Sequence, residues 1–216
     1  MDHAKKMDKI YRYQRYIYDA TRKYFLLGRD TLLDRLPIKP HQHILEMGCG
    51  TGRNLVELVK RYPETYFYGI DASEEMLIAA QSKLKNTDFV THLTLKQGLA
   101  EELDYAETFN LEKPFDCIFF SYTLSMIPEW QTALDVALKN LKPNGELYVV
   151  DFFDQAKLPL WFHKILIKWL SLFSVHYNPA WLPYFKALEQ QGLGKLEYQG
   201  LFRRYTLLLK FTKAVS

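Results

Sequence analysis

The stretch from residue 44 to residue 52 constrains the fold more than any other part of the chain. It reads Ile-Leu-Glu-Met-Gly-Cys-Gly-Thr-Gly, so an apolar run leads directly into three glycines at every second position. A short apolar run of this kind is typical of a buried strand, and glycine lets the backbone turn tightly without a side chain in the way. We therefore expect a strand that ends in a tight turn whose N–H groups can approach a bound cofactor.

The glycine spacing also selects among cofactors. Dinucleotide-binding turns place glycines at the first, third and sixth positions, and counting from Gly48 the sixth position is Arg53. No Lys-Ser or Lys-Thr pair follows the turn, which argues against a phosphate-binding P-loop. Glu-x-Gly-x-Gly-x-Gly at residues 46–52 instead resembles the class I S-adenosylmethionine (SAM) methyltransferases, in which glycines shape the floor under the methionine half of SAM.

A second signal lies in residues 65–76. Residues 65–71 are β-branched and aromatic and end in Asp71, and the following Ala-Ser-Glu-Glu-Met is typical of a helix start capped by Ser73. We expect Asp71 at the carboxyl end of a strand, about 20 residues past the glycine turn, where a carboxylate can accept hydrogen bonds from both hydroxyls of a ribose. The alternative is that Asp71 only caps the next helix, a position that Ser73 fills better.

The resemblance implies a set of cofactor contacts in which Glu46 holds the turn, while Ala72 and Met76 flank the adenine. The expected cofactor-binding residues are Tyr16, Arg22, Lys23, Glu46, Gly48, Cys49, Gly50, Gly52, Asn54, Asp71, Ala72, Met76, Gly98, Leu99, Ala100 and Ser121.

Residues 97–101 depart from the family pattern. They read Gln-Gly-Leu-Ala-Glu where the family often has Gly-Asp-Ala-Glu, so Leu99 stands in place of the expected acid. Backbone groups at Leu99 and Ala100 are therefore the expected partners of the adenine amine.

Strand-like and helix-like periods alternate as far as residue 155, the pattern of a parallel sheet covered by helices on both faces. The run at 115–121 is apolar almost throughout, as a central strand buried on both faces should be. The expected elements are helices at 53–62, 74–85 and 130–141 and strands at 44–47, 65–71, 92–97, 115–121, 146–151, 196–201 and 205–212. With the resemblance, this predicts an α/β, Rossmann-like class I methyltransferase fold. Its seven-stranded, mostly parallel sheet has an antiparallel last strand, and the final two strands pair through the Gly200 region.

Composition places the chain among ordinary globular proteins. Its 216 residues are 48% hydrophobic and 25% charged, which suits one substantial core. No apolar run of roughly 18 residues and no signal-peptide pattern occurs, so a cytoplasmic protein is expected. Cys49 and Cys117 are the only cysteines and are expected as reduced thiols; with no clustered Cys/His spacing, no metal is expected.

The amino-terminal arm, residues 1–40, is basic and rich in tyrosine. Residues 1–35 hold nine Lys or Arg against five Asp, a net charge of +4, and the whole chain carries only +3, so the rest makes no basic stripe for nucleic acid. We expect a helix that covers the SAM site, with Tyr16, Tyr18, Arg22 and Lys23 meeting the cofactor. The alternative is a solvated basic helix whose tyrosines pack on the core.

Residues 41–216 form the expected methyltransferase core, with an insertion at 156–180 just beyond the fifth strand. Residues 156–177 contain three lysines, no acids and many Trp, Phe, Leu and Ile. Such a segment suits a membrane interface, where tryptophans lie at headgroup depth and lysines meet anionic lipid. A lid over a hydrophobic small molecule and a dimer interface are the alternatives.

Residues 7–30, followed by the turn at 46–54, resemble the bacterial methyltransferases of betaine-lipid synthesis. Those enzymes convert diacylglyceryl-homoserine to diacylglyceryl-N,N,N-trimethylhomoserine with three SAM molecules. The resemblance implies a SAM-dependent N-methyltransferase for a lipid headgroup, bound peripherally at the inner face of the cytoplasmic membrane. The alternatives are a SAM-dependent methyltransferase for a quinone or another lipophilic small molecule, and an inactive protein with the SAM-binding fold.

Methyl transfer from a sulfonium to an amine is an in-line displacement, so the protein mainly aligns the reactants and excludes water. The amine must first lose a proton, which solvent or a side chain at the carboxyl edge of the sheet can take. The candidates, whose aromatic members can also stabilise a quaternary cation, are Tyr18, Tyr122, Asp151 and His163. Arg22, Arg29 or Arg203 is expected to pair with the homoserine carboxylate.

Overall fold

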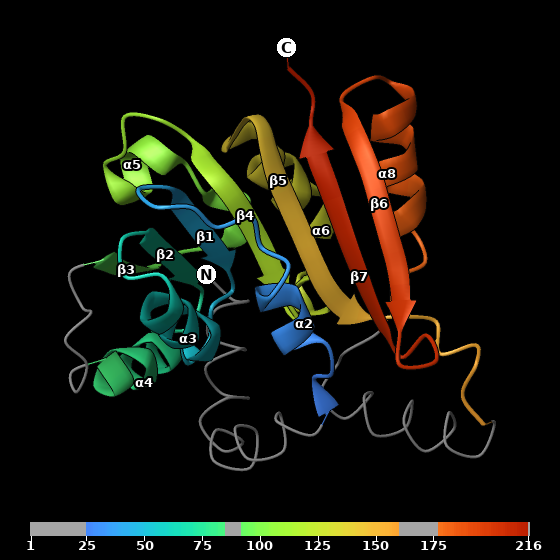
Figure 1. Cartoon of the computed structure of the whole chain (residues 1–216), viewed down its shortest axis with the longest axis horizontal. Coiled ribbons are helices and arrows are strands. Elements are labelled where there is room, and N and C mark those ends of the chain that lie inside the picture. Colours follow the sequence, from blue (N-terminus) through green and yellow to red (C-terminus); the bar gives the residue numbers. More distant parts are fainter. Residues whose placement is uncertain (1–24, 85–91, 160–176, 216) are drawn as a thin grey trace.

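The computed structural model describes residues 25–84, 92–159 and 177–215. Their strands form one seven-stranded sheet in the order β3-β2-β1-β4-β5-β7-β6 (Figure 1). The bounds are β1 His43–Met47, β2 Tyr66–Asp71, β3 Leu93–Gln97, β4 Phe115–Ser121, β5 Leu141–Phe152, β6 Gly194–Leu201 and β7 Thr206–Lys213. This confirms the expected α/β fold class.

The sheet is parallel from β3 to β5, and β7 is antiparallel to both of its neighbours, β5 and β6. The chain runs outward from β1 to β2 and β3 on one side, then returns to β4 on the other side. In open α/β sheets, this reversal of strand order leaves a crevice at the carboxyl ends of the central strands. The glycine turn follows β1 and therefore lies at that crevice.

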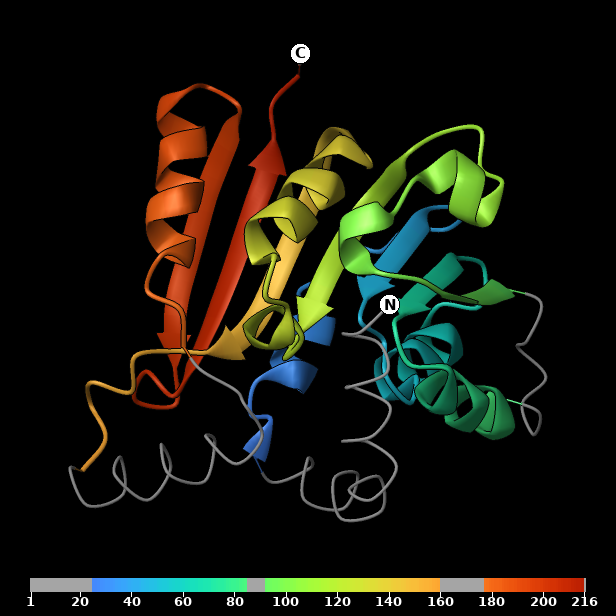
Figure 2. The same cartoon turned by 180° about the vertical axis from the view of Figure 1, so that it is seen from behind.

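Helices cover both faces of the sheet. On one face lie α2 (Arg29–Leu33), α3 (Arg53–Arg61) and α4 (Glu74–Leu84) (Figure 1). On the other lie α5 (Tyr105–Phe109), α6 (Trp130–Lys139) and α8 (Trp181–Gln190) (Figure 2). Each face has its own hydrophobic cluster, and Phe119 of β4 belongs to one while Phe120 belongs to the other. Burial of both residues explains why the run at 115–121 is apolar almost throughout.

The connection between the last two strands lies where it was expected. β6 and β7 pair antiparallel, Gly200 opposite Leu207, and the hairpin turns at residues 202–205. Phe202, Arg203 and Arg204 all take positive φ values of 49°, 57° and 63°, and Tyr205 N donates to Phe202 O at 3.1 Å. The left-handed conformation of these three residues, none of them glycine, was not anticipated from the sequence.

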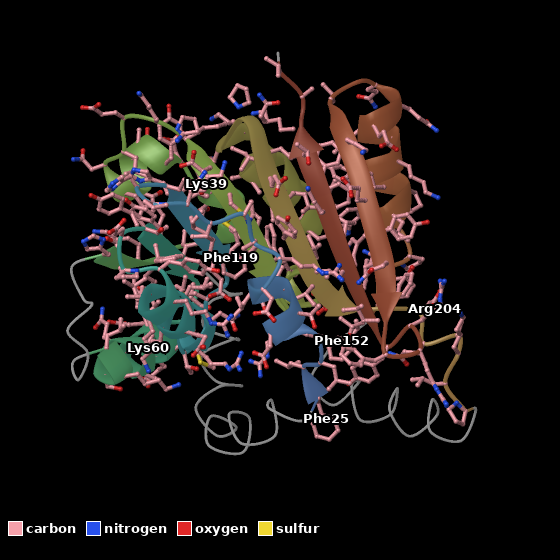
Figure 3. The ribbon with its side chains drawn as sticks, viewed as in Figure 1. Phe25, Lys39, Lys60, Phe119, Phe152 and Arg204 are labelled. Carbon is pink, nitrogen blue, oxygen red and sulfur yellow. The ribbon has the colours of Figure 1, made fainter. Side chains whose placement is uncertain are left out.

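The short helices η2 (Ala100–Glu102) and η3 (Leu124–Met126) follow β3 and β4 at the carboxyl edge. Phe152 and Arg204 lie along this edge together with Phe25 (Figure 3). Cys49 and Cys117 are buried free thiols, and burial raises the pKa of each well above the ordinary value. Among the described residues, no helix is long and apolar enough to cross a membrane.

Candidate functional site

The glycine turn is built from left-handed backbone. Gly48, Gly50 and Gly52 have φ values of 69°, 53° and 70°, a region that side chains disfavour. The N–H groups of Gly48 and Cys49 both donate to Ile70 O, at 2.8 and 3.0 Å, so the turn is held against the end of β2. Gly52 then precedes the first residue of α3.

Gly48 is in close contact with the loop that follows β4. A Cβ at Gly48 would lie 2.1 Å from Thr123 Cγ2 and 2.8 Å from Thr123 Oγ1. Thr123 Oγ1 also donates to Gly48 O at 3.1 Å. Only a residue without a side chain allows this approach, so the turn after β1 and the loop after β4 form one continuous wall.

Asp71 joins the glycine turn to the start of α4. Its Oδ2 accepts from Gly50 N at 2.7 Å, and its Oδ1 accepts from Ser73 N at 2.9 Å. Ser73 Oγ accepts from Met76 N at 3.4 Å, as expected of the helix cap. An ionised carboxylate has about four acceptor positions, so these two bonds leave Asp71 able to accept further bonds from a ligand.

One pocket, here the Asp71 pocket, lies between the turn and the loops after β2, β3 and β4. Its lining residues are Gly48, Gly50, Ile70, Asp71, Ala72, Met76, Gly98, Leu99, Ala100, Glu101, Tyr122, Thr123, Met126 and Ile127. Eight of the expected cofactor-binding residues therefore meet in one cavity. Glu101 was not anticipated, although it is the first acid after the Leu99 position and could have been considered for that reason.

A second pocket, here the Arg29 pocket, opens on the other side of Gly48 and has a volume of about 400 Å³. Its lining residues are Leu26, Arg29, Glu46, Gly48, Cys49, Thr51, Arg53, Asn54, Lys83 and Ser121. Three of them are cationic, namely Arg29, Arg53 and Lys83. Arg53 pairs with Asp30 at 2.8 Å, and Lys83 Nζ donates to Thr51 O at 3.4 Å. Lys83 was missed by the sequence analysis, because nothing in α4 marks one lysine as facing the turn.

Two buried polar residues shape the Arg29 pocket. Glu46 is 2% exposed and its Oε1 accepts from Asn54 Nδ2 at 2.6 Å, which ties β1 to the first turn of α3. Ser121 is also buried, and its Oγ has no hydrogen-bond partner in the described part of the chain. A buried hydroxyl without a partner is costly, so a ligand that bonded to Ser121 would recover free energy.

Tyr122 lines the Asp71 pocket but is held by bonds within the protein. Its side chain is buried, and its hydroxyl donates to Leu27 O at 2.6 Å and lies 2.8 Å from Thr206 Oγ1. Burial raises the pKa of the Tyr122 phenol well above its ordinary value. The hydroxyl therefore ties the segment before α2 to β7, and its expected role as proton acceptor stays a prediction.

Asp151 is likewise withdrawn from the edge of the sheet. It is fully buried, and it accepts from Ser125 N at 3.0 Å and Phe152 N at 2.8 Å. Burial raises the pKa of Asp151 to about 6. Asp151 lines neither pocket and holds the loop after β4, and its expected role as proton acceptor stays a prediction.

The remaining expected residues divide into two groups. Arg29 lines the Arg29 pocket, whereas Arg203 lies at the exposed hairpin tip and lines neither pocket. The other candidates lie outside the described residues, and they are Tyr16, Tyr18, Arg22, Lys23 and His163.

Comparison with known proteins gives the same class. A family model described as a methyltransferase domain matches residues 38–196. Trans-aconitate 2-methyltransferase of Methylobacterium nodulans is 32% identical over 118 residues, covering 55% of this chain and 41% of the relative. Demethylmenaquinone methyltransferase of Lactobacillus johnsonii is 27% identical over 169 residues, covering 76% of this chain and 65% of the relative. Phosphatidylethanolamine N-methyltransferase of Cereibacter sphaeroides is 31% identical, covering 54% of each chain.

The chain thus spans between about two fifths and two thirds of the length of these curated relatives. Among solved structures, it resembles phosphoethanolamine N-methyltransferase 2 of Haemonchus contortus in complex with SAM. The TM-score is 0.67 at 14% identity, covering 87% of this chain and 52% of that one, and it supports the fold. The chain belongs to the methyltransferase-domain family, and its domain is of the SAM-dependent class that the glycine turn predicts.

Proposed function

We propose that this protein is a SAM-dependent N-methyltransferase that methylates the homoserine amine of a diacylglyceryl lipid headgroup, a step of betaine-lipid synthesis. The choice of an amine rests on the similarity to a phosphatidylethanolamine N-methyltransferase, an enzyme named for an amine-bearing lipid. The resemblance of residues 7–30 to betaine-lipid methyltransferases supports the homoserine headgroup, although residues 7–24 lie outside the described structure.

The residues present fit SAM. The nucleoside would lie in the Asp71 pocket, with Asp71 accepting from the ribose hydroxyls and apolar Ala72 and Met76 beside the base. The methionine part would lie in the Arg29 pocket, where Arg29 can pair with a carboxylate and Ser121 Oγ needs a partner. The two pockets share Gly48, so one extended molecule can occupy both.

When bound, SAM supplies a methyl group on a sulfonium sulfur, which is transferred by in-line displacement. The chain's own contribution is then alignment and exclusion of water, which are large effects in bimolecular reactions. Thr123 packs on Gly48, and Asp151 holds Ser125, so the loop after β4 is fixed beside the turn. The Tyr122 hydroxyl and the Asp151 carboxylate are both bonded within the protein, so we infer that the proton of the amine goes to solvent, Tyr18 or His163, the last two lying outside the described residues.

We infer that the protein works at the inner face of the cytoplasmic membrane, because a diacyl substrate is reached only from a bilayer surface. The insertion at 156–180 is the proposed contact, and its residues 160–176 lie outside the described structure.

The test is expression in a host that makes diacylglyceryl-homoserine, followed by mass spectrometry of the extracted lipids. We expect mono-, di- and trimethylated headgroups in cells with the wild-type protein and none with Asp71→Ala. Absence of methylated lipid with a well-expressed wild-type protein would contradict the proposal.

A second candidate is methylation of a quinone or another lipophilic small molecule. It is favoured by the similarity to a demethylmenaquinone methyltransferase, which extends over 76% of this chain, compared with 54% for the phosphatidylethanolamine enzyme. Incubation of the purified protein with labelled SAM and total lipid extract separates the two, because the label would appear in a quinone fraction rather than in a polar lipid.

A further inference from the structure

A third pocket lies beside the Asp71 pocket, behind the loop that follows β4. This aromatic pocket has a volume of about 420 Å³, and its lining residues are Leu124, Ser125, Ile127, Pro128, Trp130, Tyr177, Asn178, Pro179 and Trp181. Ile127 lines both the aromatic pocket and the Asp71 pocket, so the wall between them is one loop thick. A ligand in the aromatic pocket would therefore lie next to the proposed cofactor site.

The aromatic pocket is uncharged. None of its described lining residues is Asp, Glu, Lys or Arg, whereas the Arg29 pocket contains three cations. Three carboxylates near the pocket are already bonded within the protein: Asp135 accepts from Tyr184, Asp154 accepts from Arg204 Nε at 2.7 Å, and Asp151 accepts from Ser125 N at 3.0 Å. A ligand in this pocket would thus meet aromatic rings and neutral dipoles.

The rings of the pocket are held in place by their neighbours. Tyr177 packs edge-to-face on Phe153 and on Trp181, with ring centroids 5.6 and 6.2 Å apart. Trp130 packs edge-to-face on Tyr184 at 5.7 Å. Because each ring is fixed by packing, the site is organised before a ligand arrives, which lowers the entropy lost on binding.

Trp181 adds a donor that has no acceptor. Its side chain is 1% exposed, and its indole N–H has no hydrogen-bond partner in the described part of the chain. Tryptophan and tyrosine usually find a partner when buried, and leaving a donor unpaired is unfavourable. Trp181 therefore forms the buried base of the pocket, and the rings that a ligand can touch are those of the partly exposed Trp130 and Tyr177.

These features match a methylated ammonium group. Organic cations bind over the faces of Trp and Tyr, and clusters of such rings are a known means of recognising quaternary ammonium ligands. A protonated primary amine is more strongly hydrated, and the described lining offers it no carboxylate to replace that hydration. Methylation therefore makes the headgroup a better ligand for these walls.

We propose that the aromatic pocket binds the methylated ammonium of the acceptor headgroup against the rings of Trp130 and Tyr177. This inference rests on the proposed N-methylation and adds a holding site for the partly or fully methylated product. A headgroup held one loop away from the cofactor site can re-enter it for the next methyl transfer without leaving the protein.

The test is a binding measurement on the full chain that needs neither SAM nor turnover. Isothermal titration compares choline with 3,3-dimethylbutan-1-ol, which has the same shape but a carbon in place of the charged nitrogen. We expect choline to bind about two- to thirtyfold more tightly, the range of a cation–π contribution. Ethanolamine, a protonated primary amine, should bind more weakly than choline.

Variants at Trp130, at the partly exposed rim of the pocket, provide the control. Trp130→Leu should remove the preference for choline, and Trp130→Phe, which keeps an aromatic ring, should retain most of it. Equal affinities for choline and its neutral analogue, an unchanged choline affinity in Trp130→Leu, or tighter binding of 1,4-naphthohydroquinone than of choline would overturn the proposal.

The lipid assay and the choline titration have separate outcomes, so each can contradict its own proposal. Selective choline binding by a protein that produces no methylated lipid would support the pocket and contradict the proposed substrate. Methylated lipid from a protein that does not distinguish choline from its neutral analogue would contradict the pocket alone.

Discussion

Replacement of Gly48 by alanine tests the contact that joins the two walls of the site. Gly48→Ala introduces two costs. The first is a side chain at φ 69°, which costs about 1–2 kcal/mol. The second is a Cβ at 2.1 Å from Thr123 Cγ2, which forces Thr123 or the turn to move.

The magnitude of the second cost follows from what Thr123 must give up. Overpacking in a well-packed region costs about 1–3 kcal/mol. Movement of Thr123 also weakens the hydrogen bond from its Oγ1 to Gly48 O at 3.1 Å, worth about 0.5–1.5 kcal/mol. The contact part of Gly48→Ala should therefore be about 1.5–4.5 kcal/mol, in addition to the backbone part.

Gly192 offers a matched control. Its φ is 74°, close to that of Gly48, but a Cβ at Gly192 would meet nothing within 4 Å. Gly192→Ala therefore carries the backbone cost and the gain from a less flexible unfolded chain, both of which Gly48→Ala shares. The difference between the two variants isolates the contact with Thr123.

Urea unfolding provides the free energies, and titration with S-adenosylhomocysteine provides the effect on the pocket. We expect Gly48→Ala to be less stable than Gly192→Ala by about 1.5–4.5 kcal/mol and to lose most of its ligand affinity, which Gly192→Ala should keep. Thr123→Ala should recover part of the loss when added to Gly48→Ala. Equal stabilities of the two glycine variants would refute the packing of the turn against Thr123.

Three further predictions concern single side chains. Asp71→Ala should abolish binding of S-adenosylhomocysteine. The control is Asp104→Ala, which also removes an acceptor for two backbone N–H groups but lies outside both pockets, and it should leave binding intact. Wild-type affinity in Asp71→Ala would refute the ribose role. Tyr122→Phe should lower the free energy of unfolding by about 0.5–1.5 kcal/mol, because the Leu27 carbonyl loses one of its two hydroxyl donors and keeps Thr206 Oγ1. The pH profile of methyl transfer should stay unchanged, and a shifted profile would support Tyr122 as the proton acceptor. The folded state raises the pKa of Asp151 from 3.8 to about 6 and so holds this proton more tightly than the unfolded chain does, which means that its contribution to stability falls as pH rises from about 4 to about 6. At about 1.4 kcal/mol per pKa unit, the stability difference between Asp151→Asn and wild type should change by up to about 3 kcal/mol across that window in urea titrations, and a difference that is constant with pH would contradict the buried carboxylate.

The short-range sequence pattern was enough to predict the methyltransferase fold class and the part of the site around the glycine turn and Asp71. The glycine turn, the strand ending in Asp71 and the Ser73 cap were all predicted at their observed positions, because each depends on residues close together in the sequence. Turn geometry requires glycine, and strand ends place polar residues at one edge of the sheet. The position of the hairpin between the last two strands was also predicted, but the left-handed backbone at its tip was not, because those residues include no glycine or asparagine.

Tertiary structure decided which of the chemically suitable side chains face a ligand. Tyr122 and Asp151 have the right chemistry at the right edge, yet both turn into the protein, where one binds the Leu27 carbonyl and the other binds the backbone of the loop after β4. Lys83 and Trp181 reach the pockets from helices whose sequences mark no such role. A sequence specifies what each residue can do through short-range periodicity, but burial and hydrogen-bond partners depend on strands and helices far apart in the chain, and only their packing determines which groups meet.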